Sequence, residues 1–195
     1  MKKIILLISL QVSLAAQSQR AILIEEGKSI IHAEYSSALE MRAKRRVGIG
    51  ATVAGKLGML GVAAELNFSM MESAVVGFGG GPKYSVFLAE WKHVFESRTL
   101  APYTAVGYSR WSGSGLSGSL TESTPSFFAQ KFLSNDEKQS GKFIKDILTP
   151  TFGLQYNVLS GKNAGTAFYM ELSALVSLAN LETAVIGGAG ILYYF

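Results

Sequence analysis

The chain has 195 residues, of which 48% are hydrophobic and only 16% are charged, and it contains no cysteine. The charged fraction lies below the quarter typical of soluble domains, and the lack of cysteine excludes disulfides, lipid attachment to cysteine and thiolate metal sites. The formal net charge is +4, to which Lys2 and Lys3 contribute two charges. The remaining balance gives no reason to expect a nucleic-acid partner.

The first residues have the three parts of a secretory signal peptide. Two lysines precede a short apolar run at 4–10, and small residues follow at 15–18. Because a bilayer-spanning helix needs roughly 20 residues, we favour a cleaved signal over a membrane anchor or a buried first helix. We expect the signal peptide to span residues 1–18, with cleavage after Ser18 preferred to cleavage after Ala15.

Residues 19–45 form a segment between the signal peptide and the first alternating stretch. Apolar residues that include Ile31 and Tyr35 recur at helical spacing, with charges elsewhere around the turn. The pattern predicts a short amphipathic helix within 29–45 that lies against the rim of the following domain. An extended arm, with residues 21–24 packed on that domain, is the alternative.

From residue 46 onward apolar and polar residues alternate with period two, which is typical of half-buried strands. The alternation predicts eight strands, at 46–54, 60–70, 73–79, 84–95, 101–112, 148–158, 166–178 and 183–195. Glycine is frequent and proline rare, as suits long strands joined by tight turns. Since the chain is apolar without any long apolar run after the signal, the pattern indicates a membrane barrel whose apolar faces point outward.

Aromatic residues recur on the faces assigned to the outside. Trp91 and Phe95 share one such face, and Tyr103 and Trp111 are assigned to another. The latter two are eight residues apart, which along a tilted strand corresponds to roughly 20 Å of height. That height is close to the separation of the two aromatic girdles of membrane barrels, so we expect these four residues to lie at the girdles.

The chain ends on an apolar strand in which Ile191, Tyr193 and Phe195 share one face. Here it resembles the C-terminal strand of bacterial outer-membrane β-barrels, whose terminal Phe, with an aromatic residue two positions earlier, is the assembly signal. Over 46–195 the architecture resembles small OmpA/OmpX-type barrels. The resemblance implies an all-β, eight-stranded antiparallel up-and-down barrel in the outer membrane of a Gram-negative bacterium, inserted by the barrel-assembly machinery.

The turns between the predicted strands separate into two sets. If Phe195 ends at the periplasmic rim, the segment at 19–45 and the turns near 69–72, 96–100 and 159–163 are periplasmic. The turns near 55–59, 79–83, 113–147 and 179–182 are then extracellular. The long loop at 113–147 therefore falls outside, where barrels keep their long loops. An external partner, if there is one, is expected to bind this loop.

The long loop itself contains a helical pattern. A short helix is predicted from Pro125 to about Ser134, since Thr-Pro is a common helix start and several aromatic residues follow. Its aromatic face must pack against the barrel mouth, the outer leaflet or a partner. Residues 135–145 are charged and are expected to be solvated.

Six charged residues are assigned to the barrel interior: Arg46, Glu65, Glu90, Lys92, Arg110 and Glu171. An eight-stranded barrel is filled by its own side chains, and unpaired buried charges are costly. We therefore expect hydrogen-bonded ion pairs, and the sequence leaves open which acid pairs with which base. A packed polar core that fixes the strand register is favoured over a gated polar path or a catalytic site.

Some eight-stranded outer-membrane barrels modify lipid A, and such chemistry needs a His close to a Ser and an acid. The histidines are His32 and His93; neither belongs to the deacylase-type His-x-Ser motif, and His93 is assigned to the lipid face. We therefore predict a monomeric, non-enzymatic barrel with a structural or surface-interaction role, outer-membrane lipid around it, and no cofactor or metal. A lipid A-modifying enzyme, a small-solute or hydrophobic-ligand channel, and a secreted lipocalin-like barrel with inward apolar faces are the alternatives.

Overall fold

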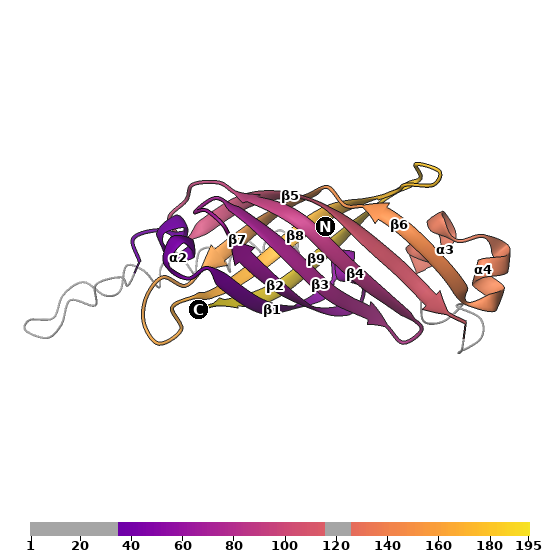
Figure 1. The fold of residues 1–195 in the computed structure, drawn as a ribbon, viewed down its shortest axis with the longest axis horizontal. Coiled ribbons are helices and arrows are strands. Elements are labelled where there is room, and N and C mark those ends of the chain that lie inside the picture. Colours follow the sequence, from indigo (N-terminus) through magenta and orange to yellow (C-terminus); the bar gives the residue numbers. More distant parts are fainter. Residues whose placement is uncertain (1–34, 116–125) are drawn as a thin grey trace, which may run out of the picture. The chain divides into compact units, whose positions relative to one another are not determined.

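The computed structural model describes residues 35–115 and 126–195, so the predicted signal peptide lies outside the described residues. A short helix precedes a β-sheet, and two short helices lie between strands β5 and β6 (Figure 1). In chain order the elements are α2 (Ala38–Lys44), β1 (Val47–Ala54), the 3-10 turn η1 (Gly55–Leu57), β2 (Leu60–Asn67), β3 (Glu72–Gly81), β4 (Tyr84–Val94), β5 (Leu100–Ser114), α3 (Ser126–Phe132), α4 (Asn135–Ser140), β6 (Lys142–Leu148), β7 (Thr151–Asn157), β8 (Thr166–Ser177) and β9 (Thr183–Tyr194).

The sheet closes on itself, because β1 pairs antiparallel with both β2 and β9. Segments β6 and β7 occupy one position in the barrel, since both pair with β5 and with β8. Their register is continuous, from Tyr108 opposite Leu148 to Ala105 opposite Thr151. The interruption includes Pro150, which has no N–H to donate to the ladder. The nine segments therefore form a closed eight-stranded antiparallel barrel, as predicted.

Segment β6 lies in the stretch that the sequence assigned to the long loop, so the limits of 113–147 are wrong. The charges of Lys142, Lys145 and Asp146 interrupt the apolar alternation there, although all three residues belong to β6. The preceding 135–140 form helix α4, which buries none of its residues, so this part of the charged stretch is solvated as expected. Its N-cap, Ser134, and its third residue, Glu137, form a capping box in which each side chain bonds the other's backbone N–H.

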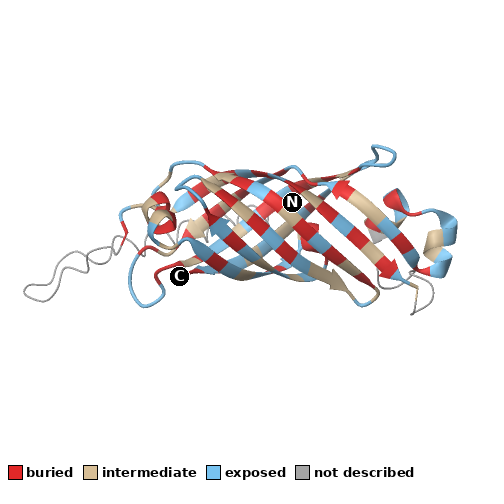
Figure 2. Cartoon of the chain, viewed as in Figure 1, coloured by how far each residue is buried: buried red, intermediate tan, exposed pale blue. Residues whose placement is uncertain are grey.

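The outer surface of the barrel is apolar. Large side chains of different strands are exposed on it, such as Ile49, Val62 and Leu172, at 55%, 60% and 61%. Buried and exposed residues alternate along the strands (Figure 2), as expected when one face lines the lumen. This polarity contradicts the secreted lipocalin-like alternative, which requires the apolar faces to point inward. Within the described ranges, no helix is long and apolar enough to cross a membrane.

The inner and outer faces of strand β5 are the reverse of those predicted. Tyr103 and Trp111 point into the lumen and are almost fully buried, so neither is a girdle residue, and Arg110 lies outside. Both faces of β5 mix apolar and polar residues, so alternation alone does not identify the inner face. Packing does, because a Cβ at Gly107 would lie 2.4 Å from the Cβ of Glu90 across the ladder. Only glycine fits at this inward position.

The other predicted girdle residues face outward. Trp91 and Phe95 are both exposed on the barrel surface, and the ring of Trp91 packs beside that of Phe68. The residues of the predicted assembly signal, Phe195, Tyr193 and Ile191, are also exposed. These positions agree with the strand faces assigned from the sequence, whereas their roles at a girdle and in assembly stay predictions.

The segment before the barrel contains the predicted helix, in a shorter form. Helix α2 begins after the N-cap Ser37, whose hydroxyl accepts from the backbone N–H of Glu40. It buries apolar residues that include Ala38 and Leu39 against Val94 and the neighbouring rim of the barrel. The alternative arm at 21–24 lies outside the described residues.

Candidate functional site

The barrel lumen holds the buried charges, and they gather in two groups. At the end covered by α2, the carboxylate of Glu65 accepts on both oxygens. Arg42 Nη1 lies 2.6 Å from Oε1, and Lys92 Nζ lies 3.0 Å from Oε2. The hydroxyl of Ser73 also donates to Oε1, at 2.9 Å. All of these side chains are buried, so the carboxylate carries the compensation that a buried charge requires.

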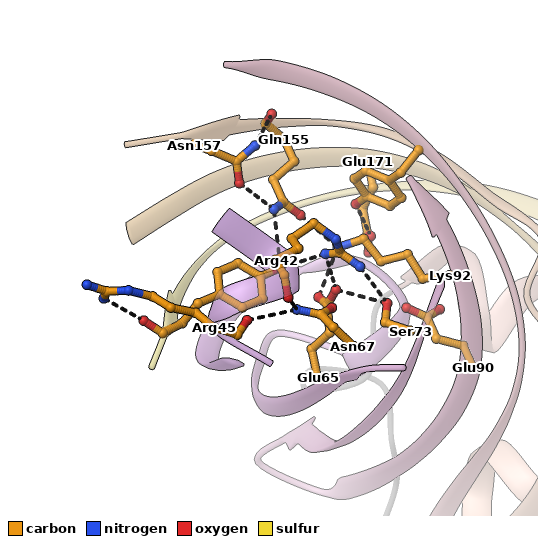
Figure 3. Close-up of polar contacts among 12 residues, drawn as sticks. Arg42, Arg45, Glu65, Asn67, Ser73, Glu90, Lys92, Gln155, Asn157 and Glu171 are labelled. Carbon is orange, nitrogen blue, oxygen red and sulfur yellow. Dashed lines mark hydrogen bonds and ion pairs between the residues drawn. The ribbon is translucent and has the colours of Figure 1, made fainter. Parts of the chain in front are cut away.

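Arg42 uses its whole guanidinium group at this end (Figure 3). Besides Glu65, it donates to the backbone oxygen of Met70, the hydroxyl of Ser73 and the hydroxyl of Tyr194, each at 3.1 Å. Burial on its own lowers the pKa of Arg42, but the adjacent Glu65 carboxylate outweighs this effect and raises the pKa overall. Arg42 therefore stays charged and ties α2 to strands β2, β3 and β9.

The same group extends across the lumen to the opposite wall. Lys92 Nζ donates to Gln155 Oε1 at 2.7 Å, and Gln155 Nε2 donates to Asn157 Oδ1 at 2.7 Å and to the Tyr194 hydroxyl at 3.2 Å. We call Arg42, Glu65, Ser73, Lys92, Gln155, Asn157 and Tyr194 the α2-end network. It joins α2 to strands on all sides of the barrel, so it can form only when these strands are in register.

The second group, the central trio, is Lys56 with Glu90 and Glu171. Lys56 Nζ lies 2.7 Å from Glu90 Oε2 and 3.0 Å from Glu171 Oε2, and Tyr103 donates to Glu171 Oε2 at 2.9 Å. All four side chains are buried. A cavity of about 30 Å³ between the trio and Lys92 has room for about one water molecule. At the level of the trio the lumen is therefore filled.

Lys56 reaches Glu90 and Glu171 because η1 folds into the barrel and does not form a turn outside it. The backbone turns inward at Ala54 and Gly55, with φ angles of 57° and 84°, and leaves at Gly58, with φ of 87°. Gly55 and Gly58 accept such angles without strain, whereas Ala54 is one of the two non-glycine residues with a positive φ among the described residues. Leu57, which follows Lys56 in η1, is buried in the apolar cluster that contains Trp111 and Phe128.

The sequence identified four of the six interior charges. Glu65, Glu90, Glu171 and Lys92 line the lumen as predicted, whereas Arg46 is exposed beside the start of β1 and Arg110 is exposed on the outer face. Arg110 lies outside because of the reversed face of β5. There its Nε is 2.8 Å from Asp146 Oδ1.

Arg42 and Lys56 take the places of these two bases, and both come from segments outside the strands. The three acids and three bases therefore balance, as expected from the cost of unpaired buried charge. With Arg46 and Arg110 both outside the lumen, Lys92 is the one inward base among the six predicted charges, so two further cations are needed to balance the three acids. The glycines at 55 and 58, on either side of Lys56, were a signal in the sequence for an inward turn.

The α3 end of the lumen is closed by aromatic side chains. Trp111 is stacked between Tyr84, at 5.4 Å between ring centroids, and Phe128 of α3, at 4.3 Å. Phe132 of α3 and Leu57 of η1 complete this α3-end cluster together with apolar residues of the strands. The helix predicted at 125–134 therefore exists as α3, and of the three candidate partners its aromatic face packs on the barrel mouth.

His93 lies on the outer face, where it was assigned. Its Nδ1 is 2.5 Å from Oε1 of Glu72, and the other carboxylate oxygen of Glu72 accepts from the indole of Trp91. The neighbouring Ser97 donates to the backbone oxygen of Leu100 instead. In the part of the chain that the structure describes, no three His, Asp or Glu side chains are grouped as a metal site would require. His32 lies outside that part.

No protein-family model matches this sequence, and no curated protein matches it. Among solved structures, the N-terminal β-barrel domain of OprF from Pseudomonas aeruginosa is 13% identical with a TM-score of 0.54, and the match covers 77% of this chain and 98% of that domain. The outer-membrane protein Ail of Yersinia pestis, in a nanodisc, is 14% identical over 77% of this chain and 99% of Ail, with a TM-score of 0.41. The likeness to the OprF domain confirms that this chain has the fold of a small eight-stranded outer-membrane barrel.

Proposed function

We propose that the protein is an integral outer-membrane barrel whose interior is a structural core and whose role lies in membrane anchorage and surface interaction. The observation that carries this proposal is the outward apolar surface. Side chains such as Val62, Phe78 and Leu172 are exposed at 60%, 60% and 61% and would face water in a soluble barrel, whereas soluble monomers rarely expose large contiguous apolar patches. A lipid environment removes that cost.

The filled lumen supports a structural role over transport. Its six charges are paired within the barrel, and the α3-end cluster covers one end while α2 covers the other. A solute would have to displace Lys56 from two carboxylates and Phe128 from Trp111. We therefore expect the purified protein to give no stepwise conductance in planar bilayers, whereas a conducting channel would show discrete openings.

The chemistry on the described surface supports a non-catalytic role. His93 is paired with Glu72 on the apolar face and has no hydroxyl nucleophile bonded to it. The connection between β5 and β6, which contains α3 and α4, lies at the end of the barrel opposite α2. A surface partner would meet this connection first, and its exposed charged helix α4 offers polar contacts.

An arginine scan tests the membrane proposal directly. Leu172 lies outside, in the middle of β8, and Leu172→Arg would cost about 2–4 kcal/mol of unfolding free energy if this face meets lipid. The same change on a water-exposed face would stay within about 0.5 kcal/mol. Leu181→Arg is the matched control, because Leu181 is exposed in the turn between β8 and β9.

The scan is read by urea unfolding in phosphatidylcholine bilayers, after gel mobility of unheated and boiled samples has shown that each variant is folded. A folded barrel migrates differently before boiling. A neutral Leu172→Arg, together with recovery of the protein in the soluble fraction, would overturn the proposal.

A further inference from the structure

The wall of the barrel has a gap at its α3 end, between β1 and β9. Pairing between these strands ends at Ala54 opposite Gly188, because β1 there turns inward to become η1. Strand β9 continues to Thr183 with β8 as its partner on the other side. Residues 183–187 therefore border an opening in the wall.

The opening leads into a groove of about 360 Å³. It is lined by apolar side chains and glycine, among them Met59, Phe127, Val185 and Trp111. Val185 and Met59 lie at the outside, with 73% and 52% of their surfaces exposed, whereas Trp111 is fully buried in the lumen. The groove therefore runs from the outer apolar surface inward to an aromatic floor.

We propose that this groove binds a single acyl chain of an outer-leaflet lipid, which enters sideways through the gap. The inference rests on the membrane placement proposed above. The volume of the groove lies at the small end of ligand pockets, and no charged side chain lines it. The one polar side-chain group of the lining, the indole N–H of Trp111, already donates to the hydroxyl of Ser109 at 3.3 Å. The open side is continuous with the lipid-facing surface, so a chain from the bilayer reaches Trp111 without crossing water.

The direction of the groove distinguishes this occupant from a protein strand. An added strand would pair along the edge of residues 183–187 and would stay in the plane of the wall. The groove instead crosses the wall, from Val185 on β9 to Trp111 on β5. A slender, unbranched apolar group suits that path.

Trp111 reports on the groove because the chain has only two tryptophans. In Trp91→Phe, Trp111 is the sole tryptophan, and phosphatidylcholine brominated on its acyl chains quenches an indole that the chains approach. We expect clear quenching of Trp111 in such vesicles. In Trp111→Phe, the remaining Trp91 is exposed on the outer face, so its quenching shows that the barrel is in the bilayer.

Two matched variants separate the groove from the rest of the wall. Gly187 lines the outer mouth of the groove, where a Cβ meets nothing closer than Cδ2 of the outward-facing Leu172 at 3.7 Å, so Gly187→Phe places a ring at the mouth without a backbone clash. Ala189 faces outward two residues further along β9 and is not part of the lining. In the Trp91→Phe background, Gly187→Phe should reduce the quenching of Trp111 at least twofold, whereas Ala189→Phe should leave it unchanged.

The outcomes separate the inference from the proposed function. Unquenched Trp91 would overturn the membrane placement itself. Quenched Trp91 with unquenched Trp111, or quenching of Trp111 that persists in Gly187→Phe, would overturn the acyl-chain site alone. A dimer that Gly187→Phe abolishes, without quenching of Trp111, would instead assign the gap to a second copy and would equally overturn it.

Discussion

The two ends of the lumen are stabilised by different kinds of interaction. At the α2 end, charged and hydrogen-bonding side chains converge on Glu65, whereas at the α3 end aromatic rings stack on Trp111. The polar end depends on exact partners, because each group loses most of its compensation when one partner is removed. The aromatic end depends on contact area and tolerates shifts. We infer that the α2-end network specifies register and that the α3-end cluster closes the barrel.

The largest effect is expected at the centre of the polar end. Glu65→Ala leaves Arg42 and Lys92 buried side by side without their carboxylate, which would cost about 3–5 kcal/mol of unfolding free energy. Urea unfolding in bilayers measures this loss. Asp146→Ala, which breaks the exposed pair with Arg110, is the control and should cost under about 1 kcal/mol. Equal losses in the two variants would contradict the assigned pairing.

The aromatic end should respond almost as strongly, by another mechanism. Trp111→Ala removes the ring between Tyr84 and Phe128 and leaves a cavity, at a cost of about 3–4 kcal/mol. Trp111→Phe retains much of the stacking and should recover more than half of that loss. Unfolding followed by gel mobility reports both. If phenylalanine were no better than alanine, stacking would not be what closes this end.

The central trio tests whether inward folding of η1 depends on charge. Lys56→Met leaves Glu90 and Glu171 without their shared cation, at about 3 kcal/mol. Adding Glu90→Gln and Glu171→Gln removes the uncompensated charge, so the triple variant should recover most of the stability. The same unfolding measurement compares the three proteins. A triple variant no more stable than Lys56→Met would mean that the lysine acts through packing.

The smallest global effect is expected for α3, which lies at the mouth. Phe128→Ala should loosen the helix from Trp111 while the strands stay paired, with about 1–2 kcal/mol lost overall. Limited proteolysis should therefore cut the connection between β5 and β6 faster, and the unheated gel band should persist. Phe127→Ala, on the same helix but only partly buried, is the control. Unchanged proteolysis would separate α3 from the closure of the barrel.

Much of the fold could be predicted because the alternation of apolar and polar residues along a strand identifies its two faces. Where one face is purely apolar, as in the stretch around Leu172, the assignment was correct. In β5 both faces are mixed, and the deciding fact is the packing of Gly107 against Glu90 of another strand. That contact is not local, so alternation could not find it.

The candidate site shows the same limit. Its acids lie on strands and were found, whereas Arg42 and Lys56 reach the lumen only because a helix and a turn fold back over the barrel ends. The spacing of residues along the chain cannot predict that a helix or a turn folds back onto the barrel. The predicted set of three acids and three bases was already balanced, so counting charges could not show that Arg46 and Arg110 lie outside the lumen.

The hydrogen bonds of Arg42 also determine the order in which parts of the barrel can assemble. Its partners include Glu65, near the start of the barrel, and Tyr194, one residue from the end of the chain. Arg42 therefore cannot complete its contacts until β9 has paired with β1. Arg42 precedes every strand in the chain but completes its hydrogen bonds only after the last strand has paired, so α2 can lock only a closed barrel.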